Sequence, residues 1–136
     1  MTKNEMNSII KAHLILYVSD QTQSAKFYSS VLNMSPTLDV PGMTEFTLNE
    51  GCILGLMPEK GIKSLLGEVI PDPASATGIP RAELYVRVDD PNTFHQRAIK
   101  HGAKELSPVD KRNWGDIAGY SMDSDGHVIA FAKAVP

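Results

Sequence analysis

Two residues that could carry acid–base or metal chemistry occupy the same place in two similar segments. His13 is the second residue of segment 12–20, and Glu83 is the second residue of segment 82–90. Both segments are rich in aliphatic and β-branched residues and end in an acidic turn, a pattern typical of a strand that leads into a helix. The matching positions predict that both side chains face the same site.

Three interpretations of His13 and Glu83 follow from their chemistry. As a polar pair in a cavity, they can contact a ligand or act as an acid and a base, which makes both of them candidate catalytic residues. As metal ligands, they can hold Zn²⁺, Ni²⁺, Mn²⁺ or Fe²⁺ only if water, substrate or another side chain completes the coordination shell. As structural residues, they are satisfied by neighbouring groups at the ends of their strands.

Other polar and aromatic residues share the phase of these two side chains, because side chains alternate along a strand. They are Tyr17 in the first strand, and Tyr85 and Arg87 in the second. Together they can bind a polar or anionic small molecule, for which Arg87 would supply a forked pair of donors. Alternatively, Arg87 pairs with Glu83 or Glu45 and organises the interior.

The remaining candidates lie outside these two strands. The single tryptophan, Trp114, can stack on a planar ligand or plug its loop against the sheet. His95 and His101 are expected to be solvated, since they lie on or at the end of a predicted helix. His127 is expected to be structural, and Cys52 to be a packed, inert thiol.

The two segments open a repeated unit. Residues 10–57 and residues 81–134 each predict a strand, a helix and three further strands, in that order. In the first strand, Leu14, Leu16 and Val18 form an aliphatic side that is expected to pack on the helix. The other faces of the two sheets are then free to meet. The predicted fold class is α+β, with two tandem βαβββ modules forming curved mixed sheets around a shared cleft.

A connector joins the two predicted modules. Residues 58–80 are rich in Gly and Pro, with a short apolar stretch, and they predict a linker that contains one helical turn. A connector of this length either covers a pocket or simply joins the two halves.

Bulk properties exclude several classes of function. The 136 residues suggest one domain, and their net charge of −3 does not support a nucleic-acid or anionic-membrane partner. No apolar run is long enough to span a membrane, and the polar N-terminal segment has no apolar signal-peptide core. One cysteine permits no intrachain disulfide, so we expect a cytoplasmic protein. The expected partner is a small molecule.

Motifs along the chain resemble the vicinal oxygen chelate superfamily, which includes glyoxalase I, extradiol dioxygenases, fosfomycin-resistance enzymes and bleomycin-resistance proteins. The resemblance covers about residues 10–134. In the first half it is carried by His13 and by Ser19-Asp20 leading to Ala25-Lys26-Phe27-Tyr28, which is close to the family's "-FY--VLG" helix. In the second half it is carried by Asn113-Trp114-Gly115, Tyr120 and Asp123-Ser124-Asp125-Gly126-His127, which are similar to the family's "WG…Y--DPDG" ending.

The resemblance implies a metal site drawn from four strand positions, which fall here on His13, Gly55, Glu83 and Ala130. Two of these residues have no donor atom, and Ala130 stands where the family ending "DGHxIE" has a glutamate. The sequence therefore favours a small-molecule-binding protein without the standard four-ligand metal site. The alternative is a divalent-metal-dependent, glyoxalase-like lyase or dioxygenase that uses His13 and Glu83. The resemblance also implies a homodimer.

Overall fold

The computed structural model describes residues 8–136, so nearly all of the polar N-terminal segment lies outside the described residues. No helix in residues 8–136 has the length and apolar character needed to cross a membrane. The elements are, in order, β1 (Ala12–Val18), α2 (Gln21–Leu32), β2 (Leu38–Val40), β3 (Met43–Asn49), β4 (Cys52–Pro58), α3 (Glu59–Leu66), β5 (Glu83–Arg87), α4 (Pro91–Lys100), β6 (Lys104–Lys111), β7 (Asp116–Met122) and β8 (Val128–Ala134).

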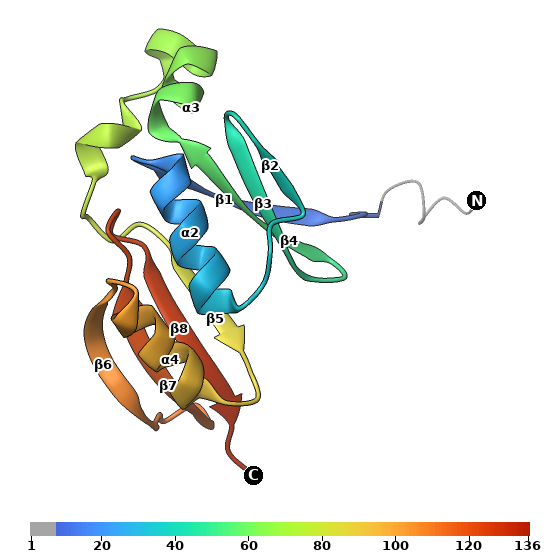
Figure 1. Cartoon of the computed structure of the whole chain (residues 1–136), viewed down its shortest axis with the longest axis vertical. Coiled ribbons are helices and arrows are strands. Elements are labelled where there is room, and N and C mark those ends of the chain that lie inside the picture. Colours follow the sequence, from blue (N-terminus) through green and yellow to red (C-terminus); the bar gives the residue numbers. More distant parts are fainter. Residues whose placement is uncertain (1–7) are drawn as a thin grey trace.

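Within residues 8–136 the strands form two four-stranded sheets (Figure 1). Sheet A has the order β1-β4-β3-β2, and sheet B has the order β5-β8-β7-β6. In each sheet the first strand runs parallel to its neighbour, and the other pairs are antiparallel. Each half of the chain is therefore a βαβββ module, and the predicted α+β fold class is confirmed.

The helix boundaries follow from local sequence signals. The side chain of Asp20 accepts a hydrogen bond from the backbone N–H of Gln23 at 3.0 Å and so caps the start of α2. Asn33 ends this helix in the left-handed conformation, with φ of 56°. Asp90 caps α4 in the same way as Asp20 caps α2, and Gly102 follows α4 with φ of 108°.

The connector is more helical than its sequence suggests. In place of the single helical turn that we predicted, residues 59–66 form α3, and two short 3₁₀ turns follow at Gly67–Val69 and Pro73–Ala76. Ile62 of α3 is buried, and Lys63 donates hydrogen bonds to the carbonyl oxygens of Gly67 and Ile70. These contacts compensate for the low helix propensity of a segment rich in Gly and Pro.

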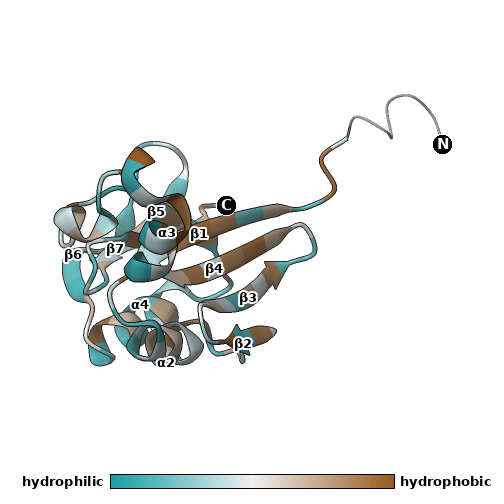
Figure 2. Ribbon diagram, turned by 90° about the horizontal axis from the view of Figure 1, so that it is seen from above, coloured by the Kyte–Doolittle hydropathy of each residue, from teal (hydrophilic) through white to brown (hydrophobic). Residues whose placement is uncertain are grey.

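One hydrophobic core serves both modules. Figure 2 shows α2 and α4 together on one side of the strands. The side of each sheet that faces these helices supplies buried aliphatic and aromatic residues, as the two-residue period predicted. On β1, β4, β5 and β8 these residues are Leu16, Val18, Leu54, Leu56, Leu84, Ile129 and Phe131. The exception is Leu14 near the start of β1, which is 39% exposed and lies outside the core.

One prediction about a single residue was wrong. His95 is not solvated: it is 1% exposed, and its Nε2 lies 2.8 Å from a carboxylate oxygen of Glu105. It fits under α4 because Gly119 has no side chain; a Cβ there would lie 2.8 Å from Nδ1 of His95. Cys52 is only partly buried, because it begins β4 next to the hairpin turn.

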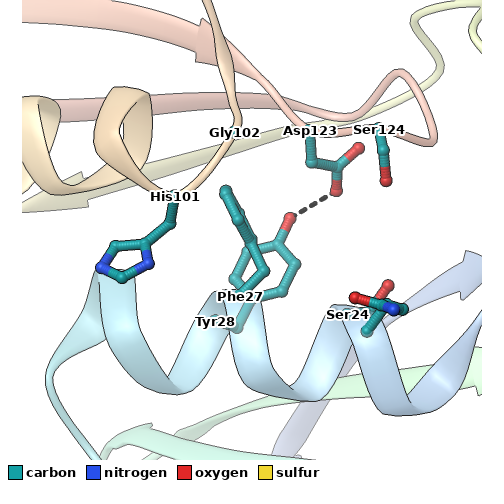
Figure 3. Close-up of a pocket in the computed structure, with 8 residues that line it drawn as sticks. Ser24, Phe27, Tyr28, His101, Gly102, Asp123 and Ser124 are labelled. Carbon is teal, nitrogen blue, oxygen red and sulfur yellow. Dashed lines mark hydrogen bonds between the residues drawn. The ribbon is translucent and has the colours of Figure 1, made fainter.

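Helix α2 also contacts the second module directly. The hydroxyl of Tyr28 donates a 2.6 Å hydrogen bond to Asp123, which precedes the β7–β8 turn (Figure 3). Burial, followed by the charge of Asp123, raises the pKa of Tyr28 well above its ordinary value of 10.0. A small pocket of about 230 Å³ lies at this junction and is lined by Ser24 and Phe27 from α2 and by His101, which follows α4.

We predict that Tyr28→Phe lowers the free energy of unfolding by about 1.5–3 kcal/mol, because it leaves an oxygen of buried Asp123 without its donor. Urea denaturation at pH 7 measures this change. Because folding raises the pKa of Tyr28, its contribution is complete below pH 10 and is lost as the pH rises further.

Tyr17→Phe is the matched control, since the Tyr17 hydroxyl has no hydrogen-bond partner within residues 8–136. We expect it to change the unfolding free energy by less than about 0.5 kcal/mol. Equal losses in the two variants would contradict a specific role for the contact between Tyr28 and Asp123.

Candidate functional site

The predicted site residues lie on the faces of the two sheets that point away from α2 and α4, here called the open faces. On sheet A, the strand register places Ile15 beside Gly55, and Gly55 opposite Glu45. His13 and Tyr17 flank Ile15 on the same side of β1, because side chains alternate. The predicted phase of the first strand is therefore confirmed.

His13 has a carboxylate neighbour on its own sheet. Its Nδ1 lies 3.6 Å from a carboxylate oxygen of Glu45 on β3. The predicted partner, Glu83, starts β5 on the other sheet, and no contact joins it to His13 within one chain. The structure thus forms a polar pair at His13, but with Glu45 in place of Glu83.

The rest of the open face of sheet A is largely apolar and, apart from its contact with α3, exposed. Ile15 is 39% exposed, and Leu38 and Val40 on β2 are exposed to a similar degree. The β2–β3 register sets Leu38 opposite Glu45 and Val40 opposite Met43, so these side chains share the side of Ile15. A contiguous exposed apolar patch of this kind commonly marks a binding surface.

Sheet B presents a polar open face built around Asp116. Arg87 on β5 reaches across to this carboxylate at the start of β7 and donates to both of its oxygens at 3.1 Å. The hydroxyl of Tyr85 donates to the same carboxylate in a short hydrogen bond. Asp116 is almost fully buried, whereas the side chain of Arg87 is 65% exposed. The alternative that Arg87 pairs with Glu83 or Glu45 is wrong.

The same network sets the ionisation of its members. The hydrogen bond from Tyr85 and the ion pair with Arg87 hold the pKa of Asp116 below its ordinary value of 3.8, although burial opposes them. Burial and the hydrogen bond to Asp116 raise the pKa of Tyr85 above 10.0. Asp116 is therefore a carboxylate and Tyr85 a neutral phenol at pH 7.

Trp114 and Tyr120 extend this face. The indole Nε1 of Trp114 donates a 3.0 Å hydrogen bond to the hydroxyl of Tyr85, yet the side chain of Trp114 stays 54% exposed. Burial raises the pKa of Tyr120, and the nearby carboxylate of Glu83 raises it further. Glu83 itself is exposed on the same face. Trp114 is thus held by its loop and by Tyr85 without being buried as a plug.

The four metal-ligand positions implied by the resemblance do not form a site in one chain. A Cβ on Gly55 would lie 3.1 Å from Ile15 and 3.3 Å from Met43, so apolar groups fill the space that a ligand side chain would need. Ala130 is fully buried and has no donor. Across residues 8–136, no cluster of three or more His, Cys, Asp or Glu side chains could hold a metal ion.

The structure therefore gathers the predicted residues into two groups. His13 and Tyr17 lie on sheet A. Glu83, Tyr85 and Arg87 lie on sheet B, and Trp114 joins them from the β6–β7 loop through its hydrogen bond to Tyr85. Two members, Glu45 and Asp116, were not singled out as site residues from the sequence. Asp116 carried no distinguishing signal in the sequence, since its burial and its contact with Arg87 depend on the fold.

Comparison with protein families agrees with this architecture. A family model described as Glyoxalase/Bleomycin resistance protein/Dioxygenase superfamily matches residues 11–131. The chain belongs to this superfamily. The resemblance drawn from the sequence motifs is thereby confirmed. A comparison with curated proteins found no match.

Solved structures with the same fold include members of this superfamily. A glyoxalase-related enzyme from Fulvimarina pelagi is 24% identical, with 90% of this chain and 86% of that chain covered and a TM-score of 0.75. A glyoxalase/bleomycin resistance protein/dioxygenase from Nocardioides is 21% identical, with 97% and 89% covered and a TM-score of 0.72. A hypothetical protein from S. aureus is 15% identical, with 98% and 100% covered and a TM-score of 0.78. At these identities the likeness concerns the fold alone.

We predict that Asp116→Asn lowers the melting temperature at pH 7 and that the loss shrinks as the pH falls. Because folding lowers the pKa of Asp116, the stability that its charge contributes is present at neutral pH and is lost as the pH drops through that value, below 3.8. Thermal unfolding from pH 7 down to pH 2.5 measures this dependence.

Asp110→Asn is the control, since Asp110 is an exposed carboxylate on β6, the strand next to β7. We expect it to leave the melting temperature nearly unchanged at every pH. A loss in Asp116→Asn that is the same at pH 7 and pH 2.5 would show that the ion pair with Arg87 contributes nothing.

Proposed function

We propose that this protein binds a small molecule between two open faces that come from different copies of the chain. The observation that carries the proposal is the position of the predicted site residues. Those on strands all belong to the open faces, while α2 and α4, which pack the two modules together, lie on the other side. In a two-fold dimer, sheet A of one copy would cover sheet B of the other, and two equivalent clefts would form.

The chemistry of the two faces supports this pairing. The open face of sheet A exposes aliphatic groups, including Ile15, Leu38 and Val40, around the pair formed by His13 and Glu45. The open face of sheet B carries aromatic rings and the ion pair of Arg87 with Asp116. A cleft between them would be a mostly apolar cavity with a few fixed polar groups, which is the usual composition of a small-molecule site.

Binding without the standard metal site is favoured over metal-dependent catalysis. Gly55 and Ala130 supply no ligand, and the space above Gly55 is already filled. The alternative remains a divalent-metal-dependent lyase or dioxygenase that uses His13 and Glu83. The pair formed by His13 and Glu45 favours it, because a second copy that brought Glu83 close would complete three ligands.

We predict that the protein sediments as a dimer of its 14.8 kDa chain and that Ile15→Glu weakens dimerisation at least about tenfold, because a carboxylate would be buried in an apolar contact. Sedimentation equilibrium over a concentration series measures this effect, with circular dichroism to verify the fold. Leu65→Glu is the matched control on α3, since Leu65 is also exposed but lies off the open faces.

The pairing is contradicted by a wild-type monomer at high protein concentration. It is also contradicted if Ile15→Glu and Leu65→Glu leave the dimer equally intact.

We further predict that protein purified without chelator, then incubated with excess Ni²⁺, Zn²⁺, Mn²⁺ or Fe²⁺ and desalted, retains far less than one metal ion per chain. Within residues 8–136 no three ligand side chains are already arranged around one point, so a divalent cation is held weakly in competition with water. Elemental analysis of the wild type, His13→Ala and Glu83→Ala gives the measurement. Stoichiometric metal in the wild type that is lost in both variants would establish the metal-dependent alternative.

A further inference from the structure

Arg87 combines exposure with a fixed orientation, which is uncommon for a surface arginine. Its side chain is 65% exposed, whereas Asp116, which holds it, is 2% exposed. Nε and Nη2 of Arg87 lie 3.1–3.3 Å from the two carboxylate oxygens, so one edge of the guanidinium group is fully engaged. Because the group is already ordered, a ligand that binds it does not bear the entropic cost of ordering a long side chain.

The outward edge of the same guanidinium group is free. Nη1 of Arg87 has no hydrogen-bond partner within residues 8–136. The Asp116 oxygens that could compete for it already accept from Arg87 and Tyr85. The group therefore presents unused N–H donors to the cleft side of sheet B, a geometry that suits a carboxylate.

An exposed aromatic surface belongs to the same hydrogen-bond network as Arg87. Trp114 donates to the Tyr85 hydroxyl, which in turn donates to the Asp116 oxygen that Nε of Arg87 contacts. The indole is thus linked to the guanidinium group through two intervening side chains, and it remains 54% exposed. An exposed aromatic ring and a forked cation on one face of the sheet suit a planar molecule that carries an acidic group.

We propose that the open face of sheet B recognises a planar organic carboxylate, with its acid group on Arg87 and its flat part against Trp114. Asp116 acts as a positioning residue that holds the guanidinium group. The inference rests on the proposed function, since it names the class of ligand for the cleft between the open faces. Glu83, an exposed carboxylate on the same strand, has no hydrogen bond or ion pair with Arg87 and leaves its outward edge free.

The test compares benzoate with benzamide, which have nearly the same shape and differ in charge. The protein has a single tryptophan, so its one indole N–H resonance reports on this face directly. Titration at pH 7 is expected to shift the indole resonance with benzoate at concentrations about tenfold lower than with benzamide. Equal potency of the acid and the amide, or no shift with either, would overturn the inference.

Variants then separate the role of Arg87 from general electrostatic attraction. In Arg87→Gln, the preference for benzoate is expected to disappear, so that benzoate and benzamide shift the indole resonance at about equal concentrations. Lys111→Gln, which removes an exposed cation at the end of β6 on the opposite edge of sheet B, is expected to keep the preference. A preference that survives Arg87→Gln, or that Lys111→Gln reduces equally, would overturn the role of Arg87.

Asp116→Asn changes benzoate affinity in opposite directions for a positioning role and for a simple charge effect. Removal of a negative charge would strengthen binding of an anion if only net charge mattered. If Asp116 positions Arg87, the variant instead weakens benzoate binding several-fold, while the resonances of the rest of the protein show a folded chain. Tighter benzoate binding in Asp116→Asn would overturn the positioning role.

Two controls keep these outcomes distinct. If Arg87→Gln fails to fold, the double variant Arg87→Gln with Asp116→Asn replaces the ion pair with two neutral amides and is subject to the same expectation. Sedimentation of each sample reports on the dimer. A dimer that binds acid and amide equally overturns the ligand class alone, whereas a monomer overturns the proposed cleft itself.

Discussion

The packing of α2 against the second module determines where every other surface of the protein lies. Tyr28 reaches from α2 to Asp123, and α2 and α4 share one buried core with the inner sides of both sheets. This contact places the two helices together on one side of the strands (Figure 2). The opposite side of each sheet is consequently left largely open, with α3 contacting part of β1 and β4, and the candidate site residues lie there or in the adjoining β6–β7 loop.

The division between core and open face was readable from the sequence because it depends on a local rule. Alternation along β1 separated Leu16 and Val18 from His13 and Tyr17, and the same rule assigned Tyr85 and Arg87. Helix caps at Asp20 and Asp90 were equally local signals. The repeat of these signals in two halves was sufficient to predict the fold class.

The remaining features depend on contacts between distant segments, which no local pattern encodes. His95 resembled a surface residue on a helix, yet it is buried because Gly119 on β7 leaves room for its ring. Arg87 lies far in sequence from Asp116, and His13 from Glu45, so neither partner was predicted. The helix α3 forms through its own packing in a segment whose composition indicated a linker.

The central proposal is that sheet A of one copy would cover sheet B of another. Its most direct test uses mixed dimers. One chain, without ¹⁵N, carries a spin label on the cysteine of His13→Cys in a Cys52→Ser background. This chain is mixed with wild-type chain that is ¹⁵N-labelled. We predict strong broadening of the Trp114 indole resonance of the ¹⁵N-labelled chain by the spin label on its partner. An unbroadened resonance, in a sample that sedimentation shows to be dimeric, would contradict the proposal.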